Sequence, residues 1–146
     1  MVSFAAPPGV DPSAWPFVEN ESYHFYFGAE SGGLLACPMD EDPVEPADAR
    51  PDDLVVARAL DLVERLTPAL VPKTLRTKWA GLRTFSPDRG FVIGEDPCVR
   101  GFFWLAGQGG SGIETSPAAG EIAADLLLTG KTGRFNADLL SPSRFR

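Results

Sequence analysis

The stretch GFFWLAGQGGSGIETSPAAGE, residues 101–121, joins an apolar segment, a glycine-rich turn and the start of a helical pattern. Gly107, Gly109 and Gly112 satisfy G-x-G-x-x-G, the pattern of a turn that binds a dinucleotide. A dinucleotide site also needs a second parallel strand with an acidic residue about 20 residues further on. The polar residues after Gly130 predict no such strand. A self-sufficient dinucleotide site is therefore the least favoured interpretation.

Two other interpretations of this turn stay open. The turn is either a structural connection, or a site where backbone N–H groups and the positive helix end stabilise an anionic oxygen. The second interpretation fits the pyrimidine end of a reduced flavin as well as a phosphate. We favour it, because strand, glycine loop and helix start follow each other in the order that such a site needs.

Composition and charge bound the possible functions. The chain has 146 residues, 44% of them hydrophobic, which suffices for one domain with its own core. Its net charge of −7 argues against a nucleic-acid partner, because phosphate contacts need clustered Lys and Arg. Cys37 and Cys98 match no metal-ligand spacing and suggest no disulfide framework, so we expect no metal site. No apolar run suits a membrane span and no signal peptide is evident, so we expect a cytoplasmic protein.

The first half of the chain predicts a hairpin and a helix. Residues 1–22 hold four prolines and are expected to be an extended lead-in. The aromatic run at 23–27 and the apolar run at 34–39 predict two strands joined by a turn. The acidic, proline-rich segment 40–53 predicts a loop. A helix then follows, because apolar residues recur at helical spacing up to Pro68: Val56, Leu60, Val63 and Leu66.

The second half predicts short strands and one more helix. A strand interrupted near Gly81 is expected over 75–85, and another over 90–94. Segment 101–106 is apolar on both faces, as expected for a strand buried inside a sheet. The last helix is expected to begin between Gly112 and Pro117 and to end at Gly130, and residues 131–146 to form a surface tail. The elements together indicate an α+β fold with antiparallel strands. Too few neighbours are evident for strand 101–106, which suggests a fragment.

Two motifs carry a resemblance to a known family. Trp79–Arg83 reads W-x-G-x-R, and Gly107–Ile113 reads G-x-G-G-x-G-I. With this spacing the chain resembles the C-terminal signature of FAD-dependent D-amino-acid oxidases and dehydrogenases, and within that group it is most similar to bacterial D-arginine dehydrogenases. Residues 25–46 further resemble the hairpin and acidic loop of the substrate domain in this family. The resemblance covers residues 23–130.

The resemblance implies how the chain is organised. Residues 23–90 would be a partial substrate domain, made of the hairpin, the acidic loop, a crossing helix and a strand. Residues 91–130 would be the last strand–glycine loop–helix unit of the FAD-binding domain. The N-terminal half of that domain, which in the family carries the true G-x-G-x-x-G turn, is absent from this sequence. A separate N-terminal FAD-binding half is therefore an expected partner.

The resemblance also implies an activity with FAD as cofactor. The parent enzyme would oxidise the CH–NH group of a D-amino acid or related amine to an imine, by hydride transfer to the flavin. The chain alone would be inactive. The alternative is a non-catalytic binding or interaction module that kept the fold after losing the cofactor half.

Three residues are candidates for positioning the substrate. Arg83 lies where the family holds the substrate carboxylate, and a planar guanidinium suits that task; the alternative is a surface or ion-pairing arginine. Tyr26 resembles a family tyrosine whose hydroxyl touches the same carboxylate; the alternative is a core aromatic. Gly110 would allow a close approach of the backbone to flavin and substrate.

The glycine loop supplies the predicted cofactor-binding residues. Its backbone N–H groups would stabilise the anionic flavin. The side chain of Glu114 is expected to complement the helix dipole rather than to face the ring. The predicted set is Gly107, Gln108, Gly109, Gly110, Ser111, Gly112, Ile113 and Glu114.

Overall fold

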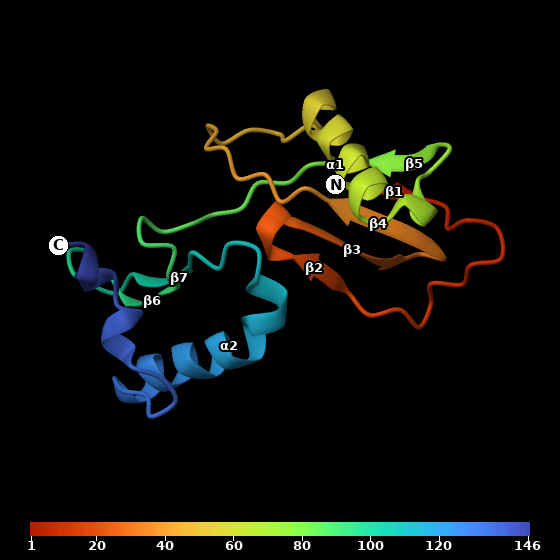
Figure 1. Cartoon of the computed structure of the whole chain (residues 1–146). Coiled ribbons are helices and arrows are strands. Elements are labelled where there is room, and N and C mark those ends of the chain that lie inside the picture. Colours follow the sequence, from red (N-terminus) through yellow and green to blue (C-terminus); the bar gives the residue numbers. More distant parts are fainter. The chain divides into compact units, whose positions relative to one another are not determined.

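The chain folds into two compact units, residues 1–82 and residues 83–146 (Figure 1). The computed structural model describes all 146 residues, and each unit is described by itself. The units meet between Leu82 and Arg83, whereas the resemblance implied a division after residue 90. As a result the W-x-G-x-R motif is divided, and Arg83 belongs to the same unit as the glycine loop.

Unit 1 is built on a five-stranded sheet in the order β2-β3-β4-β1-β5, with every pair of neighbours antiparallel. The strands are β1 (Val2–Phe4), β2 (Val18–Asn20), β3 (Phe25–Glu30), β4 (Gly33–Cys37) and β5 (Leu75–Lys78). The predicted hairpin is confirmed as β3 and β4. Ser31 and Gly32 connect them with φ values of 46° and 71°. Positive φ at both residues of a two-residue turn matches the right-handed twist of the flanking strands.

The extended lead-in expected over residues 1–22 contains strand β1, which belongs to the core of unit 1. Val2 and Phe4 are 0% and 1% exposed, and β1 lies between β4 and β5 in the sheet. Three residues are too few to show the alternation that identifies a strand in sequence. The prolines that suggested an extended lead-in all come after β1, and β2 follows them.

Helix α1 (Asp53–Leu66) covers one face of this sheet and confirms the predicted helix. Its N-cap is Asp52, whose carboxylate accepts hydrogen bonds from the backbone N–H of Leu54 at 2.7 Å and of Val55 at 3.2 Å. The short 3-10 helices η1 (Glu21–Tyr23) and η2 (Pro68–Leu70) complete the unit. The buried core between sheet and helix consists of Val2, Phe4, Phe25, Leu34, Ala36, Ala59, Leu62 and Val63.

Unit 2 contains a two-stranded antiparallel sheet and one long helix. The strands are β6 (Val92–Glu95) and β7 (Phe103–Ala106), followed by helix α2 (Gly112–Thr129) and the 3-10 helices η3 (Ala137–Leu139) and η4 (Pro142–Phe145). Its small core consists of Ile93, Ala119, Ile122, Ala123 and Leu140.

The end of the chain is part of this core. Leu140 is 8% exposed and Pro142 is buried, although 131–146 was expected to be a surface tail. The backbone N–H of Ile93 donates to the carbonyl of Leu140 at 2.9 Å, which ties the tail to β6. The sequence carries no helical or strand period there, so this packing is visible only in three dimensions.

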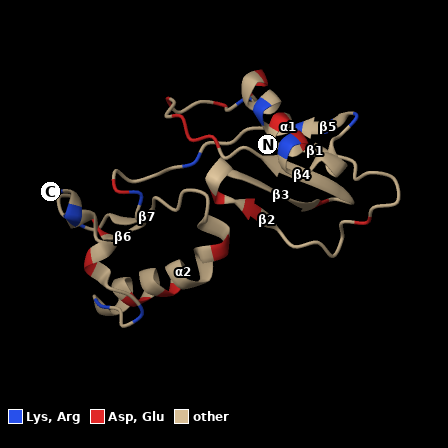
Figure 2. Ribbon diagram, in the orientation of Figure 1, with Lys and Arg blue, Asp and Glu red and all other residues tan.

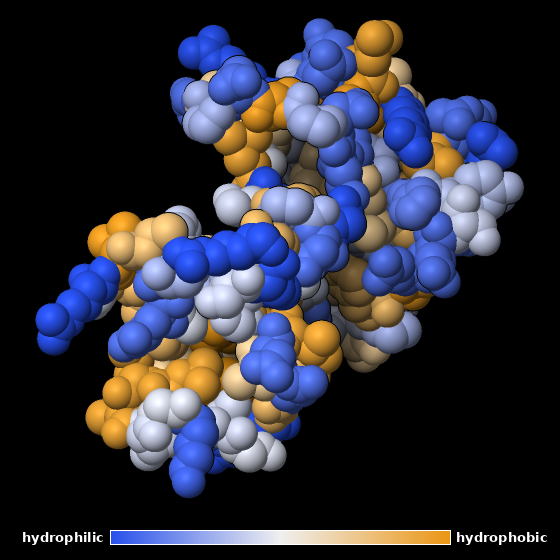
Figure 3. All heavy atoms as spheres, turned by 90° about the vertical axis from the view of Figure 1, so that its left-hand side faces the viewer, coloured by the Kyte–Doolittle hydropathy of each residue, from blue (hydrophilic) through white to orange (hydrophobic).

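Strand β7 and the segment after β5 also differ from expectation. Trp104 is 37% and Leu105 49% exposed, because β7 pairs only with β6 and nothing in unit 2 covers its other side. Figure 3 shows that hydrophobic residues lie at the surface of the molecule among hydrophilic ones. The strand expected over 75–85 ends at Lys78, and residues 79–86 have no regular structure.

Charged side chains are spread over the elements rather than gathered on one of them. Figure 2 shows acidic residues along α2, which carries Glu114, Glu121 and Asp125 and no Lys or Arg. Two of these acids bind Arg134, at 2.7 Å from Glu121 and 3.3 Å from Asp125.

None of the helices combines the length and the apolar character that crossing a membrane requires.

Replacing Phe4 tests the place of β1 in the core. We expect Phe4→Ala to lower the free energy of unfolding of unit 1 by about 3–5 kcal/mol, since a fully buried ring leaves a cavity. Val44→Ala is the matched control, because Val44 is 66% exposed in a loop. Urea unfolding followed by circular dichroism measures both. Equal effects of the two substitutions would contradict the central position of β1.

Candidate functional site

The glycine loop leaves β7 in a conformation that few residues other than glycine adopt. Gly107 and Gly109 have φ values of 76° and 54°, in the left-handed region where a Cβ is strained. Gly107 is buried. The backbone N–H of Gly109 donates to the carbonyl of Thr84 at 3.1 Å. The loop is thus anchored by its own backbone on the segment that opens unit 2.

Contacts with segment 83–90 exclude side chains at these glycines. A Cβ at Gly107 would lie 3.2 Å from the carbonyl oxygen of Gly90, and a Cβ at Gly109 would overlap the ring of Phe85. A side chain at Gly107 or Gly109 would force this backbone oxygen or this ring to move, which close packing resists. Thr84, Phe85 and Gly90 therefore support the loop, a role that no local sequence pattern indicates.

The structure brings the predicted residues Arg83 and Gly110 together. A Cβ at Gly110 would lie 3.0 Å from Cζ of Arg83, so the guanidinium occupies the space that glycine leaves. The φ of Gly110 is not positive, so a side chain at this position would meet only the end of the Arg83 side chain, which would have to shift. The side chain of Arg83 is half-buried, and no hydrogen bond or ion pair within unit 2 engages it. A guanidinium in this setting suits an anionic ligand.

The start of helix α2 also suits an anion. Ser111 is the N-cap, but its side chain makes no capping hydrogen bond. The first helical bond runs from the N–H of Thr115 to the carbonyl of Ser111 at 3.0 Å, so the three preceding N–H groups have no intrahelical partner. Ile113 is 93% exposed and Glu114 is exposed, so their side chains do not cover this end. The uncapped N–H groups and the helix dipole attract negative charge.

Helix α2 begins at Gly112, at the early limit of the predicted range. Pro117 therefore lies in the second turn, where it cannot donate to the carbonyl of Ile113. The hydroxyl of Ser116 donates to that carbonyl instead, at 2.8 Å. This replacement lets the helix start early and keeps its N-terminus next to the glycine loop.

A hollow of about 430 Å³ lies at the Gly107 end of the loop, within unit 2. Most of its lining is apolar and comes from segment 84–87, β7 and η4, including Phe85, Trp104 and Phe145. Asp96 orients Trp104 by accepting a hydrogen bond from its indole N–H at 2.8 Å. This bond, and those from the backbone N–H groups of Cys98 and Val99, hold the pKa of Asp96 below its usual range.

Tyr26 lies in unit 1 and is described apart from the loop. It is on β3, and its hydroxyl donates to the sulfur of Met1 at 3.6 Å. Its ring stacks on Phe17 with centroids 4.8 Å apart. Strand alternation puts Tyr26 on the sheet face opposite the buried Phe25, so it is not part of the helix-covered core. No group of three His, Cys, Asp or Glu side chains in the structure has a geometry that could hold a metal ion.

Comparison with known proteins shows which family the sequence resembles. Residues 1–126 match the family model described as FAD dependent oxidoreductase. The chain is 27% identical over 142 residues to FAD-dependent oxidoreductase domain-containing protein 1 of Xenopus laevis, covering 94% of this chain and 28% of that protein. It is 38% identical over 125 residues to the mitochondrial pyruvate dehydrogenase phosphatase regulatory subunit of Mus musculus, covering 79% of this chain and 14% of that protein.

Solved structures share the fold. An L-proline dehydrogenase from P. horikoshii superimposes with a TM-score of 0.79 at 25% identity, over 99% of this chain and 38% of that one. An iminodiacetate oxidase from a Chelativorans species gives a TM-score of 0.75 at 23% identity, over 97% of this chain and 38% of that one. The chain thus spans well under half the length of these relatives.

Two glycine substitutions test the loop geometry. We expect Gly109→Ala to destabilise unit 2 by about 1–3 kcal/mol, because its φ is positive and Phe85 must move. Gly120→Ala is the matched control: Gly120 lies in α2 with open space around its Cα, and we expect a gain of about 1 kcal/mol. Thermal unfolding measures both. A harmless Gly109→Ala would show that the loop does not press on segment 83–90.

Proposed function

The chain belongs to the family of FAD-dependent oxidoreductases, and from this premise we propose that unit 2 faces the flavin ring while Arg83 and Tyr26 hold the substrate. FAD is the cofactor of this family. The observation that carries the proposal is the half-buried guanidinium of Arg83 beside a side-chain-free loop and an uncapped helix N-terminus.

The residues of the loop fit the pyrimidine end of a flavin. The Cβ directions of Gly107, Gly109 and Gly110 are occupied by Gly90, Phe85 and Arg83, so in this proposal the flavin meets the loop at the N–H groups of the helix start. The N–H groups of Gly112, Ile113 and Glu114 would donate to an anionic oxygen, whereas that of Ser111 already donates to the carbonyl of Gln108 at 3.0 Å. The fixed orientation of the three N–H groups costs no reorganisation when charge develops. FAD, when bound, supplies the acceptor for the hydride. The side chain of Glu114 is exposed and does not cover the N–H groups at this end of the helix.

Arg83 is the proposed clamp for the substrate carboxylate. Its planar guanidinium can form two parallel charge-assisted hydrogen bonds with a carboxylate, which fixes the orientation of the Cα–H bond. Gly110 gives the guanidinium the room to lie against the loop. The hydroxyl of Tyr26 is the second proposed contact to the substrate carboxylate.

The proposed substrate is a D-amino acid or a related amine that carries a carboxylate, oxidised at its CH–NH group to an imine. The similar solved structure of an L-proline dehydrogenase supports a carboxylate-bearing amine, since proline is one. The likeness of the two motifs to D-arginine dehydrogenases stays a prediction, as does a cytoplasmic location.

A second polypeptide segment is needed for tight FAD binding in this proposal. The pyrophosphate and adenosine of FAD require a glycine turn between a strand and a helix, followed by a second parallel strand. The chain has one glycine loop, and it is assigned to the flavin ring. We therefore propose that an N-terminal FAD-binding half complements this chain, either as a separate partner or as part of a longer protein.

One observation favours a different function. The mouse relative is named a regulatory subunit, not an enzyme. In this alternative the chain is a non-catalytic binding module that keeps the family fold. Conversion of an amine by the flavin-loaded complex distinguishes the two functions.

The chain alone is expected not to hold FAD. The 146-residue protein is mixed with FAD and desalted, and its visible absorption spectrum is recorded. We expect no stoichiometric flavin band, because only the ring end of the cofactor finds contacts here. After co-expression with an FAD-binding half, a flavin band is expected. Tight binding to the chain alone would overturn the need for a second half.

Replacing Arg83 tests the clamp in the flavin-loaded complex. The substrate for this test is the amine that reduces the flavin fastest in the absence of oxygen, seen as bleaching of the flavin absorption. With it, we expect Arg83→Ala to lower kcat/KM by an amount equivalent to about 2–5 kcal/mol, because the substrate carboxylate loses its charged partner. Arg83→Lys should recover part of this loss, since it keeps the charge but not the fork. Arg100→Ala, in the exposed loop between β6 and β7, is the control and should leave kcat/KM unchanged. Bleaching by no amine at all would favour the regulatory alternative.

A further inference from the structure

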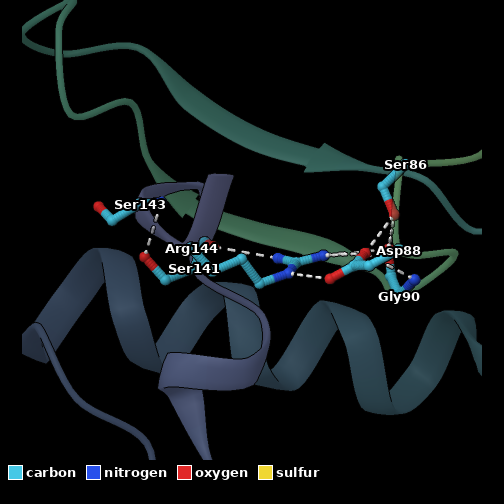
Figure 4. Close-up of polar contacts among 6 residues, drawn as sticks. All are labelled: Ser86, Asp88, Gly90, Ser141, Ser143 and Arg144. Carbon is cyan, nitrogen blue, oxygen red and sulfur yellow. Dashed lines mark hydrogen bonds and ion pairs between the residues drawn. The ribbon is translucent and has the colours of Figure 1, made fainter. Parts of the chain in front are cut away.

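The guanidinium of Arg144 makes several polar contacts, although this residue lies in the segment expected to be a surface tail. Its Nε donates to Oδ2 of Asp88 at 2.7 Å and its Nη2 to Oδ1 at 3.0 Å, a two-pronged pairing that Figure 4 shows. Its Nη1 donates to the carbonyl of Ser141 at 3.0 Å, and its guanidinium lies 4.2 Å from the ring centre of Phe145. The side chain is only 14% exposed. This residue joins η4 to segment 86–90 across more than 50 positions of sequence.

The carboxylate of Asp88 also accepts hydrogen bonds from within its own turn, residues 86–90. Its Oδ1 accepts from the backbone N–H of Gly90 at 3.0 Å and lies 2.8 Å from the hydroxyl of Ser86 (Figure 4). That hydroxyl is also 2.6 Å from the carbonyl of Gly90, and its single hydrogen serves one acceptor at a time. Arg144, followed by Ser86, keeps the pKa of Asp88 well below its usual range. The carboxylate thus stays charged at neutral pH and holds turn 86–90 together.

The same turn is the surface on which the glycine loop begins. A Cβ at Gly107 would lie 3.2 Å from the carbonyl oxygen of Gly90 and 3.6 Å from the backbone nitrogen of Ser86. Nη2 of Arg144 also reaches this carbonyl of Gly90, at 3.3 Å. A shift of turn 86–90 would therefore change the packing around Gly107. The η4 residue Phe145 lines the hollow beside the loop together with Ser86.

From these contacts we infer that Arg144 is a positioning residue for the glycine loop. By pairing with Asp88 it fixes turn 86–90, and this turn fixes Gly107 and the loop that follows. Arg144 touches neither flavin nor substrate in this inference. The inference rests on the proposed function only in that the positioned loop is the one assigned to the flavin.

The chemistry of the pair calls for arginine. Two parallel N–H···O bonds to one carboxylate, with further donors to two backbone carbonyls, use the planar fork of a guanidinium. A lysine at position 144 would keep the charge but offers one nitrogen for these acceptors. We therefore expect Arg144→Lys to rescue the effect of Arg144→Ala only in part.

Amide exchange in the chain itself tests the inference. The N–H of Gly109 donates to Thr84 and reports on the anchoring of the loop. Hydrogen exchange is measured by NMR on the 15N-labelled 146-residue protein. We expect exchange of this amide to be at least about tenfold faster in Arg144→Ala, with Ala123 in α2 as an internal reference that changes little. Arg134→Ala is the matched control, because it removes another arginine of unit 2 that pairs with two carboxylates.

The outcomes separate positioning from general stability. Equal exchange at Gly109 in Arg144→Ala and Arg134→Ala would overturn the inference, and so would equal acceleration at Gly109 and Ala123. If Arg144→Ala does not fold, Asp88→Asn takes its place, since it keeps the shape and removes the charge. A failure of both variants to fold would assign the pair to overall stability and overturn the inference as well.

A second readout links the loop to the cofactor. In the flavin-loaded complex we expect Arg144→Ala to shift the reduction potential of the flavin, because loop N–H groups no longer hold their place, whereas Arg134→Ala should not. An unshifted potential beside a loosened loop would overturn the link to flavin while leaving the positioning role in place. Absence of flavin from every complex would instead overturn the proposed function, and the exchange result on the chain alone would stand.

Discussion

The glycine loop and segment 83–90 lie so close together that neither has room to change independently. The carbonyl of Gly90, the ring of Phe85 and the guanidinium of Arg83 each occupy the place where a Cβ would project from a loop glycine. Close packing of this kind transmits small displacements, because interiors resist compression. The bare backbone of the loop, the position of Arg83 and the uncapped start of α2 all depend on this contact.

Unit 2 needs additional support for this contact because its own sheet is small. A two-stranded sheet is marginal in water by itself, and the apolar core of unit 2 consists of five buried residues. Helix α2 packs on β6, and Leu140 ties the tail to the same strand. The ion pair between Arg144 and Asp88 also joins η4 to segment 86–90. The carboxylate of Asp88 is half-exposed, so this pair fixes local geometry more than it adds to the stability of unit 2.

The two units carry different parts of the proposed chemistry. Unit 1 presents Tyr26 on a broad sheet whose other face is sealed by α1, so this face is free of the core. Unit 2 presents Arg83 next to the loop and the positive helix end. The chain passes from one unit to the other inside the W-x-G-x-R motif.

Local patterns in the sequence determined the elements whose signal lies within a few residues. The hairpin β3–β4, helices α1 and α2 and the glycine turn follow from alternation, helical spacing, caps and glycine content, and the two motifs pointed to an FAD-dependent oxidoreductase. Only the tertiary structure placed β1 in the sheet, left β7 exposed, set Arg83 against Gly110 and paired Arg144 with Asp88. These features join residues that are far apart in the chain, such as Arg144 and Asp88 at 56 positions, or the paired residues Val2 and Lys78 of β1 and β5. Neither period nor spacing encodes such a contact, because it arises from shape and charge that meet only after the chain has folded.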